Sequence, residues 1–234
     1  PESLDVWELG YKGMFWDNRI ELDASTFFYT YENLQQFVSA AGGLPRLENA
    51  PESEITGFDA NVRYAGDSGL YLQAGVSILD TEVTESGDSS FAEGAELAMA
   101  PEVSFNLLAS QNFQLERGNE RNLTANIAPS GDQVNSTAAN GNENVVDQLT
   151  QEAYPLVHAN LTYRFGDAGQ YAFSLYGRNL TDEQYCGHIL VNDGNAILAG
   201  PSPASGKKDT NQSVLCRVTN ASTRTFGASI SVDF

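Results

Sequence analysis

The chain ends in RTFGASISVDF, residues 224–234, where apolar residues alternate with small or polar ones. The apolar positions are Phe226, Ala228, Ile230, Val232 and Phe234. Because successive side chains of a β-strand point to opposite faces, this pattern predicts a strand with one apolar and one polar face. The apolar face must contact either a protein core or lipid. The pattern of the other segments and their connections distinguishes these two possibilities.

Eight further segments show the same alternation, and turn residues separate them. They are WELGYKGMF (7–15), RIELDASTFFYTY (19–31), TGFDANVRY (56–64), LYLQAGVSI (70–78), VSFNLLASQNF (103–113), NLTANIA (122–128), VHANLTYRF (157–165) and QYAFSLYGRN (170–179). Together with the C-terminal segment they predict nine strands, and no segment predicts a helix. The fold class is therefore all-β with antiparallel strands.

The connections between these segments alternate between short and long. The short ones are tight turns rich in Gly, Asp and Asn, at 16–18, 65–69, 116–121 and 166–169. Long polar stretches lie between them, at about 32–52, 81–99, 130–152 and 187–221. In an antiparallel sheet this order places all the short turns at one rim and all the long connections at the other, which is typical of transmembrane β-barrels.

The two faces of the predicted strands differ in charge. Charged side chains such as Lys12, Glu21, Arg63 and Arg164 fall on one face, and Leu, Val, Ile and aromatic residues fall on the other. Aromatic residues also gather beside the short turns, where an interfacial girdle would lie. This distribution favours lipid on the apolar face, although a soluble antiparallel sheet packed on a core shows the same alternation.

Composition excludes several classes of function. The chain has 31 acidic and 12 basic residues, a net charge of −19, which argues against nucleic-acid binding. The acidic run between Arg63 and Arg117 predicts a solvated loop, because it lacks the spacing of a calcium site. No hydrolase, metalloprotease or phosphate-loop motif is present, so we expect no catalytic residue, no metal site, no cofactor and no enzyme activity.

Two cysteines, Cys186 and Cys216, flank a stretch rich in Gly, Pro, Asn and Ser. An isolated pair of this kind favours a disulfide and an oxidising compartment. Two unrelated thiols remain the alternative, whereas zinc is disfavoured because only His188 is near.

The segments YGRNLTDEQY (176–185) and RTFGASISVDF (224–234) resemble the C-terminal end of TonB-dependent outer-membrane receptors. Residues 7–35 and 49–64 resemble middle barrel strands of the same family. The resemblance implies that residues 1–234 are the C-terminal portion of a transmembrane barrel of about 22 strands, with the plug domain and N-terminal strands absent.

The resemblance also implies a function. We expect an outer-membrane receptor that binds a scarce extracellular ligand, such as a siderophore, cobalamin or saccharide, for energy-coupled import. The implied partners are the remaining barrel strands and plug, the TonB inner-membrane complex acting through the plug, lipid and lipopolysaccharide, and the barrel-assembly machinery. A passive porin-like or structural outer-membrane barrel is the alternative, and a soluble secreted β-sandwich binding module is the second.

Candidate ligand contacts come from the long loops and the upper part of the polar face. They are Tyr31, Asn33, Gln35, His158, Arg178 and Tyr185. The terminal Phe234 is expected to act as the signal that the barrel-assembly machinery reads.

Overall fold

The structure is a computed structural model. It describes residues 1–39, 45–87, 91–115, 120–130, 133–134, 150–166, 169–186, 188–193, 212–218 and 223–233. Within these ranges every regular element is a β-strand. A search of the same residues finds no helix with the length and apolar character to span a membrane.

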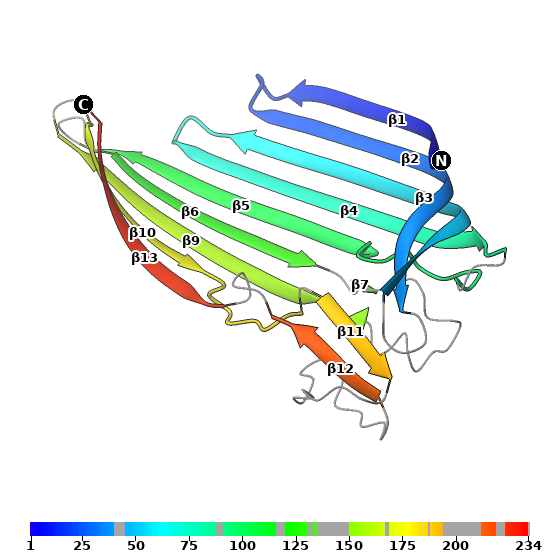
Figure 1. Ribbon diagram of the computed structural model, residues 1–234. Helices are drawn as coiled ribbons and strands as arrows, with labels where there is room; N and C mark the ends of the chain where they lie inside the picture. The colour runs from blue at the N-terminus through cyan, green and yellow to red at the C-terminus, as the bar shows by residue number, and fades with distance from the viewer. Residues whose placement is uncertain are drawn as a thin grey trace.

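Nine antiparallel strands form one curved sheet (Figure 1). They are β1 (Ser3–Phe15), β2 (Ile20–Ser39), β3 (Pro45–Ala65), β4 (Leu70–Glu85), β5 (Val103–Gln114), β6 (Glu120–Ser130), β9 (Tyr154–Phe165), β10 (Tyr171–Arg178) and β13 (Thr225–Val232). Neighbours in the sheet follow chain order, so β1 and β13 form its two edges. All nine predicted strands, including the weakly patterned 122–128, are confirmed.

Two small hairpins lie outside this sheet. One pairs β7 (Gln133–Val134) with β8 (Thr150–Gln151), and the other pairs β11 (His188–Asp193) with β12 (Gln212–Arg217). Both fall in stretches that the sequence predicted only as long connections. Neither pair adds a strand to the main sheet, so both elaborate the rim that carries the long connections.

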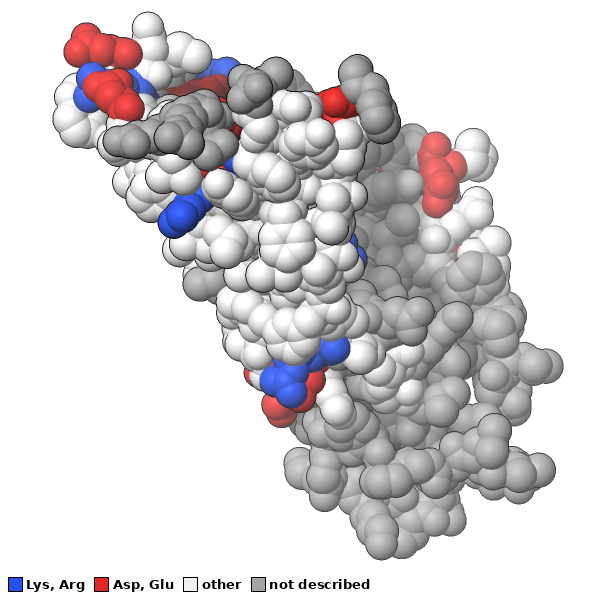
Figure 2. Space-filling model, turned by 90° about the vertical axis from the view of Figure 1, so that its left-hand side faces the viewer, with Lys and Arg blue, Asp and Glu red and all other residues white. Residues whose placement is uncertain are grey.

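The register of the sheet joins the apolar positions of all nine strands into one face. Leu161 of β9 pairs with Leu123 of β6 and Leu175 of β10, and Leu175 pairs with Ala228 of β13. This face is solvent-exposed in the isolated sheet: Trp7 and Ile230, near its two edges, are 77% and 76% exposed. Figure 2 shows a broad uncharged area between charged groups near its upper end and a charged cluster lower down. A patch this extensive requires another apolar phase or surface to cover it.

Tight turns connect the strands at one rim, at the left of Figure 1. Trp16, Asp17 and Asn18 have φ values of 51°, 56° and 63°. Gly69 has a φ of 82°, and a Cβ there would lie 2.4 Å from the carbonyl oxygen of Asn112. The predicted turns at 16–18 and 65–69 are therefore confirmed, whereas 116–119 and 167–168 lie outside the described residues.

Aromatic rings line the same rim, as the sequence predicted. The rings of Trp16 and Tyr64 stack with centroids 6.1 Å apart. The Phe165 ring stacks on Tyr163 at 5.5 Å and on Tyr171 at 5.3 Å. These residues come from three strands and one turn, so the rings lie at more than one place along the rim.

The prediction of a long polar connection at 32–52 is wrong for most of its length. Strands β2 and β3 remain paired through this stretch, as far as Ser39 and Pro45. Among the described residues of this stretch, only Asn33, with a φ of 56°, and Pro51 opposite it lack a place in the ladder. The alternating pattern fades there because the hairpin projects beyond the sheet: Leu34 and Ala50 pack on a small local core, whereas side chains such as Gln35 and Leu47 are exposed, so no continuous face must be apolar.

The predicted solvated connection at 81–99 is also partly wrong. Strand β4 continues to Glu85, and the following segment returns beside it through a hydrogen bond from the Val83 N–H to the Ala95 carbonyl of 2.9 Å. The returning segment covers a small buried core of Ala50, Val83, Phe91 and Leu97. Phe91 and Leu97 of this acidic run supply apolar side chains to that core, and Ala95 and Ala100 pack against it.

The carboxylate of Glu96 in this segment provides a pH test. Burial, followed by the nearby carboxylates of Glu102 and Asp80, raises its pKa above the ordinary value of 4.5. The folded segment therefore favours neutral Glu96, so its stability is highest at low pH and falls as pH rises through the raised pKa. Because Glu96 is exposed, Glu96→Gln should stabilise the segment by only a few tenths of a kcal/mol at pH 7.

Hydrogen exchange of the Leu97 amide, which donates to the Thr81 hydroxyl at 3.1 Å, measures this effect. Protection should increase in Glu96→Gln at pH 7 and match the unsubstituted protein at pH 4. Glu85→Gln, at the exposed end of β4, is the control and should change protection at neither pH. Equal protection of Glu96→Gln and the parent protein at pH 7 would contradict a raised pKa of Glu96 in the folded segment.

Candidate functional site

The polar face of the sheet carries a charged network near the turn-bearing rim. The Lys12 ammonium lies 3.0 Å from a Glu21 carboxylate oxygen and 3.5 Å from Asp23, and the Arg63 guanidinium lies 3.2 Å from Glu21. These residues come from β1, β2 and β3, where the register places them on one face. The opposite charges satisfy one another, so this part of the wall is hydrated and close to neutral.

Hydroxyl and amide groups continue the polar face across β5, β6, β9 and β10. The Asn122 side-chain amide donates to the Ser110 hydroxyl at 3.1 Å, and the Thr124 hydroxyl donates to the Asn122 side-chain oxygen at 2.8 Å. The Thr162 and Ser174 hydroxyls lie 2.8 Å apart. Side chains that hold one another in this way present a fixed pattern of donors and acceptors.

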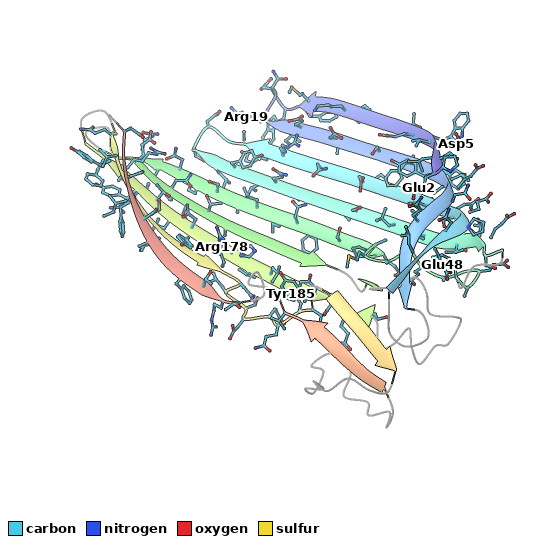
Figure 3. All side chains as sticks on the ribbon, viewed as in Figure 1. Glu2, Asp5, Arg19, Glu48, Arg178 and Tyr185 are labelled. Atoms are coloured by element: carbon cyan, nitrogen blue, oxygen red, sulfur yellow. A yellow bond between two sulfur atoms is a disulfide. The ribbon has the colours of Figure 1, made fainter. Side chains whose placement is uncertain are left out.

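A recess of about 460 Å³ opens in this wall between β6, β9 and β10. Its lining includes Thr124, His158, Asn160, Tyr176 and Arg178. The His158 Nδ1 accepts a hydrogen bond of 3.1 Å from the Asn179 backbone N–H, which leaves the proton of the neutral ring on Nε2. The Arg178 guanidinium lies over the Tyr176 ring, 5.6 Å from its centroid. Figure 3 shows Arg178 on the sheet and Tyr185 beyond the end of β10.

A buried asparagine closes the turn that follows β10. Asn179 is fully buried and has a φ of 49°. Its side-chain amide donates to the Glu183 carbonyl at 2.8 Å, and its oxygen accepts from the Glu183 N–H at 3.0 Å. Its backbone N–H reaches His158, so the asparagine joins the turn to the recess.

A disulfide ties the base of the β11–β12 hairpin, and it confirms the predicted pairing. Cys186 and Cys216 are bonded, with Cα atoms 5.2 Å apart. The Cys186 N–H donates to the buried Gln151 side chain at 2.9 Å, and Tyr185 stacks on Tyr154 with centroids 4.4 Å apart. A hydrogen bond and a ring stack therefore hold segments 150–154 and 185–186 together, and the disulfide joins Cys186 to β12.

Loss of this disulfide should loosen the loops without unfolding the sheet. The bond closes a loop of 30 residues, which the chain-entropy relation values at about 3–4 kcal/mol. In the double substitution Cys186→Ser and Cys216→Ser, limited proteolysis should cleave within 187–221 at least ten times faster. Protection of the β9 and β10 amides in hydrogen exchange is the control and should stay unchanged. Equal cleavage rates would show that the loop is held by its other contacts.

The structure places the six predicted ligand residues in two separate groups. Tyr31, Asn33 and Gln35 lie on the projecting part of β2, and the Gln35 N–H donates to Glu2 at 2.7 Å. His158 and Arg178 share the recess, which β3, β4 and β5 separate from β2. Tyr185 stacks beside the disulfide. Figure 3 likewise shows Glu2, Asp5 and Glu48 around the far ends of β1 to β3, away from Arg178.

Sequence reasoning missed four residues that shape the recess or its surroundings: Gln151, Asn160, Tyr176 and Asn179. Tyr176 and Asn160 follow the polar phase of β10 and β9, so the alternation alone could have included them. The role of Gln151 depends on a contact across 35 positions, which leaves no local signal. Within the described ranges no three His, Cys, Asp or Glu side chains group as a metal site, and Phe234 lies outside those ranges.

Comparison with known proteins gives the family of this chain. The sequence model of the family described as "TonB dependent receptor-like, beta-barrel" matches residues 1–180. Among solved structures, the chain is similar to the ferric yersiniabactin uptake receptor FyuA from Yersinia pestis, with a TM-score of 0.72 and 17% identity over 100% of this chain. It is also similar to the ferric-catecholate import receptor Fiu from K12 E. coli, with a TM-score of 0.65, 19% identity and 100% coverage.

The copper transporter OprC matches with a TM-score of 0.65 and 16% identity, again over 100% of this chain. The chain spans 30% of the length of FyuA, 28% of Fiu and 31% of OprC. The family is one of transporters rather than enzymes, and the fold that this chain shares with these three structures agrees with the family match. The chain belongs to the TonB-dependent receptor β-barrel family.

Proposed function

We propose that this chain is the C-terminal portion of the barrel of an outer-membrane receptor that imports a scarce extracellular ligand by energy-coupled transport. The observation that carries the proposal is the nine-stranded sheet with one continuous apolar face and one polar face. Its family match and its similarity to about 30% of an uptake receptor support the same conclusion.

The apolar face contacts lipid in this proposal. Exposed side chains such as Leu9, Phe105, Leu161 and Ile230 lie on it, and the aromatic rings of the turn-bearing rim lie at the periplasmic headgroups. Strands β1 and β13 each have one neighbour in the sheet. Unpaired backbone groups are costly in lipid, so further strands of the same receptor must pair with both edges and close a barrel of about 22 strands.

The partners follow from the family. A plug domain fills the lumen, the TonB complex of the inner membrane acts on the plug, and lipopolysaccharide surrounds the outer rim. The C-terminal Phe234 is the residue that the barrel-assembly machinery recognises. Phe234→Ala should lower the amount of receptor in the outer membrane while leaving the ligand affinity of the assembled fraction unchanged.

The recess is the ligand contact that the described wall supports best. It brings together Arg178, His158 and Tyr176, which are a cation, an imidazole N–H and a phenol. Such groups bind the charged oxygens of an organic metal complex better than they bind a bare metal ion. Ferric complexes are named for FyuA and Fiu, and we propose a ligand of that class here.

Uptake of radioactive iron by whole cells tests the function. Cells that express the receptor should accumulate a ferric siderophore from a panel at nanomolar concentration, and a protonophore should abolish the uptake. Cells with the gene deleted are the control. Accumulation that rises linearly with concentration and ignores the protonophore would instead support the passive barrel.

A further inference from the structure

The recess in the polar wall has an unusual charge for this protein. The whole chain carries −19, yet none of the described residues that line the recess is acidic. Arg178 forms no ion pair with any described residue, unlike Lys12 and Arg63 of the same face. The guanidinium is therefore a cation without a counterion among the described side chains.

The donors around the recess have few partners among the described residues. The His158 Nδ1 is engaged by Asn179, so the ring can present only its Nε2 proton to the recess. Arg178 has five N–H donors, and Tyr176 has a hydroxyl that no described residue binds. The Asn160 amide already donates to Thr162 at 3.1 Å. An acceptor with negative charge and several oxygens satisfies these donors, whereas a cation does not.

A glycine of the last strand determines where the arginine lies. Gly227 pairs directly with Tyr176, and a Cβ on Gly227 would lie 2.3 Å from both the Cζ and the hydroxyl of Tyr176. The tyrosine ring therefore occupies the space above the glycine. Because the Arg178 guanidinium lies over the same ring, a displacement of Tyr176 would displace the guanidinium with it.

We infer that the recess binds an oxyanion, such as a carboxylate of the incoming ligand, and that Gly227 and Tyr176 are positioning residues for Arg178. This inference rests on the proposed function and adds the charge class of the ligand. It also gives Gly227 a role beyond its backbone hydrogen bonds. Because Gly227 of β13 has no side chain, the Tyr176 ring can lie over it, and the ring position determines where the Arg178 guanidinium of β10 lies.

The charge of the recess can be measured without the ligand. Asn160→Cys introduces a thiol into the recess of the full-length receptor, and its reaction rates with anionic and cationic methanethiosulfonates give a ratio that reports the local potential. Arg178→Gln should lower the anionic-to-cationic ratio by about 3- to 10-fold, the range expected for one charge a few ångströms away in water. Ser77→Cys on β4 is the control, because four strand spacings of about 5 Å place it beyond the screening length.

The positioning role has its own variants in the same assay. Gly227→Ala and Tyr176→Leu should each lower the ratio by at least twofold, and Tyr176→Phe, which keeps the ring, should not. If Gly227→Ala fails to assemble, Tyr176→Leu tests the same point with the glycine intact. Unchanged ratios in both would overturn the positioning role.

Citrate is the oxyanion probe. At equal ionic strength it should slow both reagents at the Asn160→Cys thiol, and Arg178→Gln should remove this protection. A thiol that reacts with neither reagent, or citrate without effect, would overturn the oxyanion site. Neither result depends on iron uptake, so failure of this inference is distinguishable from failure of the proposed receptor function.

Discussion

Leu161→Arg should prevent stable insertion of the receptor, at a cost of about 2–4 kcal/mol. Leu161 lies in the middle of β9, paired with Leu123 and Leu175, and its side chain is 42% exposed on the apolar face. If that face contacts hydrocarbon, an arginine there must be desolvated near the bilayer centre, where the penalty is largest. The measurement is the free energy of unfolding by urea from lipid vesicles, together with the folded yield.

The neighbouring position provides a matched control. Thr162 is the next residue of β9 and faces the polar wall, where it contacts Asn160 and Ser174. Thr162→Arg should cost only about 1 kcal/mol for the lost hydrogen bonds, because its guanidinium stays in water. Equal penalties at the two positions would contradict a lipid-facing surface and would favour burial of the apolar face against a second protein layer.

Asn179→Ala should destabilise the end of β10 by about 3–5 kcal/mol. The substitution leaves the N–H and carbonyl of Glu183 without their partner, at about 1–3 kcal/mol each. Because Glu183 is only partly buried, each lost partner costs at the lower part of that range, about 1–2 kcal/mol, and the alanine at a φ of 49° adds about 1 kcal/mol. Hydrogen exchange of the Glu183 amide and the midpoint of urea unfolding measure the local and global parts of this effect.

Two further substitutions divide that cost into its causes. Asn179→Gly keeps the backbone conformation without strain and loses only the hydrogen bonds, so it should be about 1 kcal/mol less harmful than alanine. Asn179→Asp keeps the oxygen that accepts from Glu183 N–H and loses the donor to the Glu183 carbonyl. A fully stable Asn179→Ala would show that the turn is held by other contacts, such as the Arg224–Asp182 ion pair.

The strands were predictable because each has to satisfy two different environments. In β9 and β13 the side chains alternate between the apolar face and the polar face of the sheet, so a period of two is imposed at every residue. The turn at 16–18 was equally readable, because its three residues adopt positive φ and include Asp17 and Asn18. Constraints that act on neighbouring residues leave a local pattern in the sequence.

Where those constraints end, prediction from the sequence weakened. Beyond Glu32 the β2–β3 hairpin projects past the sheet and packs through a local contact at Leu34 and Ala50, so its residues carry no sustained alternation although the ladder continues to Ser39. The recess brings Tyr176 onto Gly227 across 51 positions, and no local feature of either residue records that contact. The disulfide was the exception, since only two cysteines were available to form it.

The length of the β2–β3 hairpin determines how far this part of the chain projects beyond the sheet. β2 has 20 residues and β3 has 21, whereas about 10 suffice to cross the hydrocarbon. The surplus of about 10 residues, at about 3.3 Å each, carries the hairpin roughly 30 Å outward if the sheet spans the membrane as proposed. The hairpin would then extend beyond the outer leaflet, which makes it a suitable place for an epitope tag.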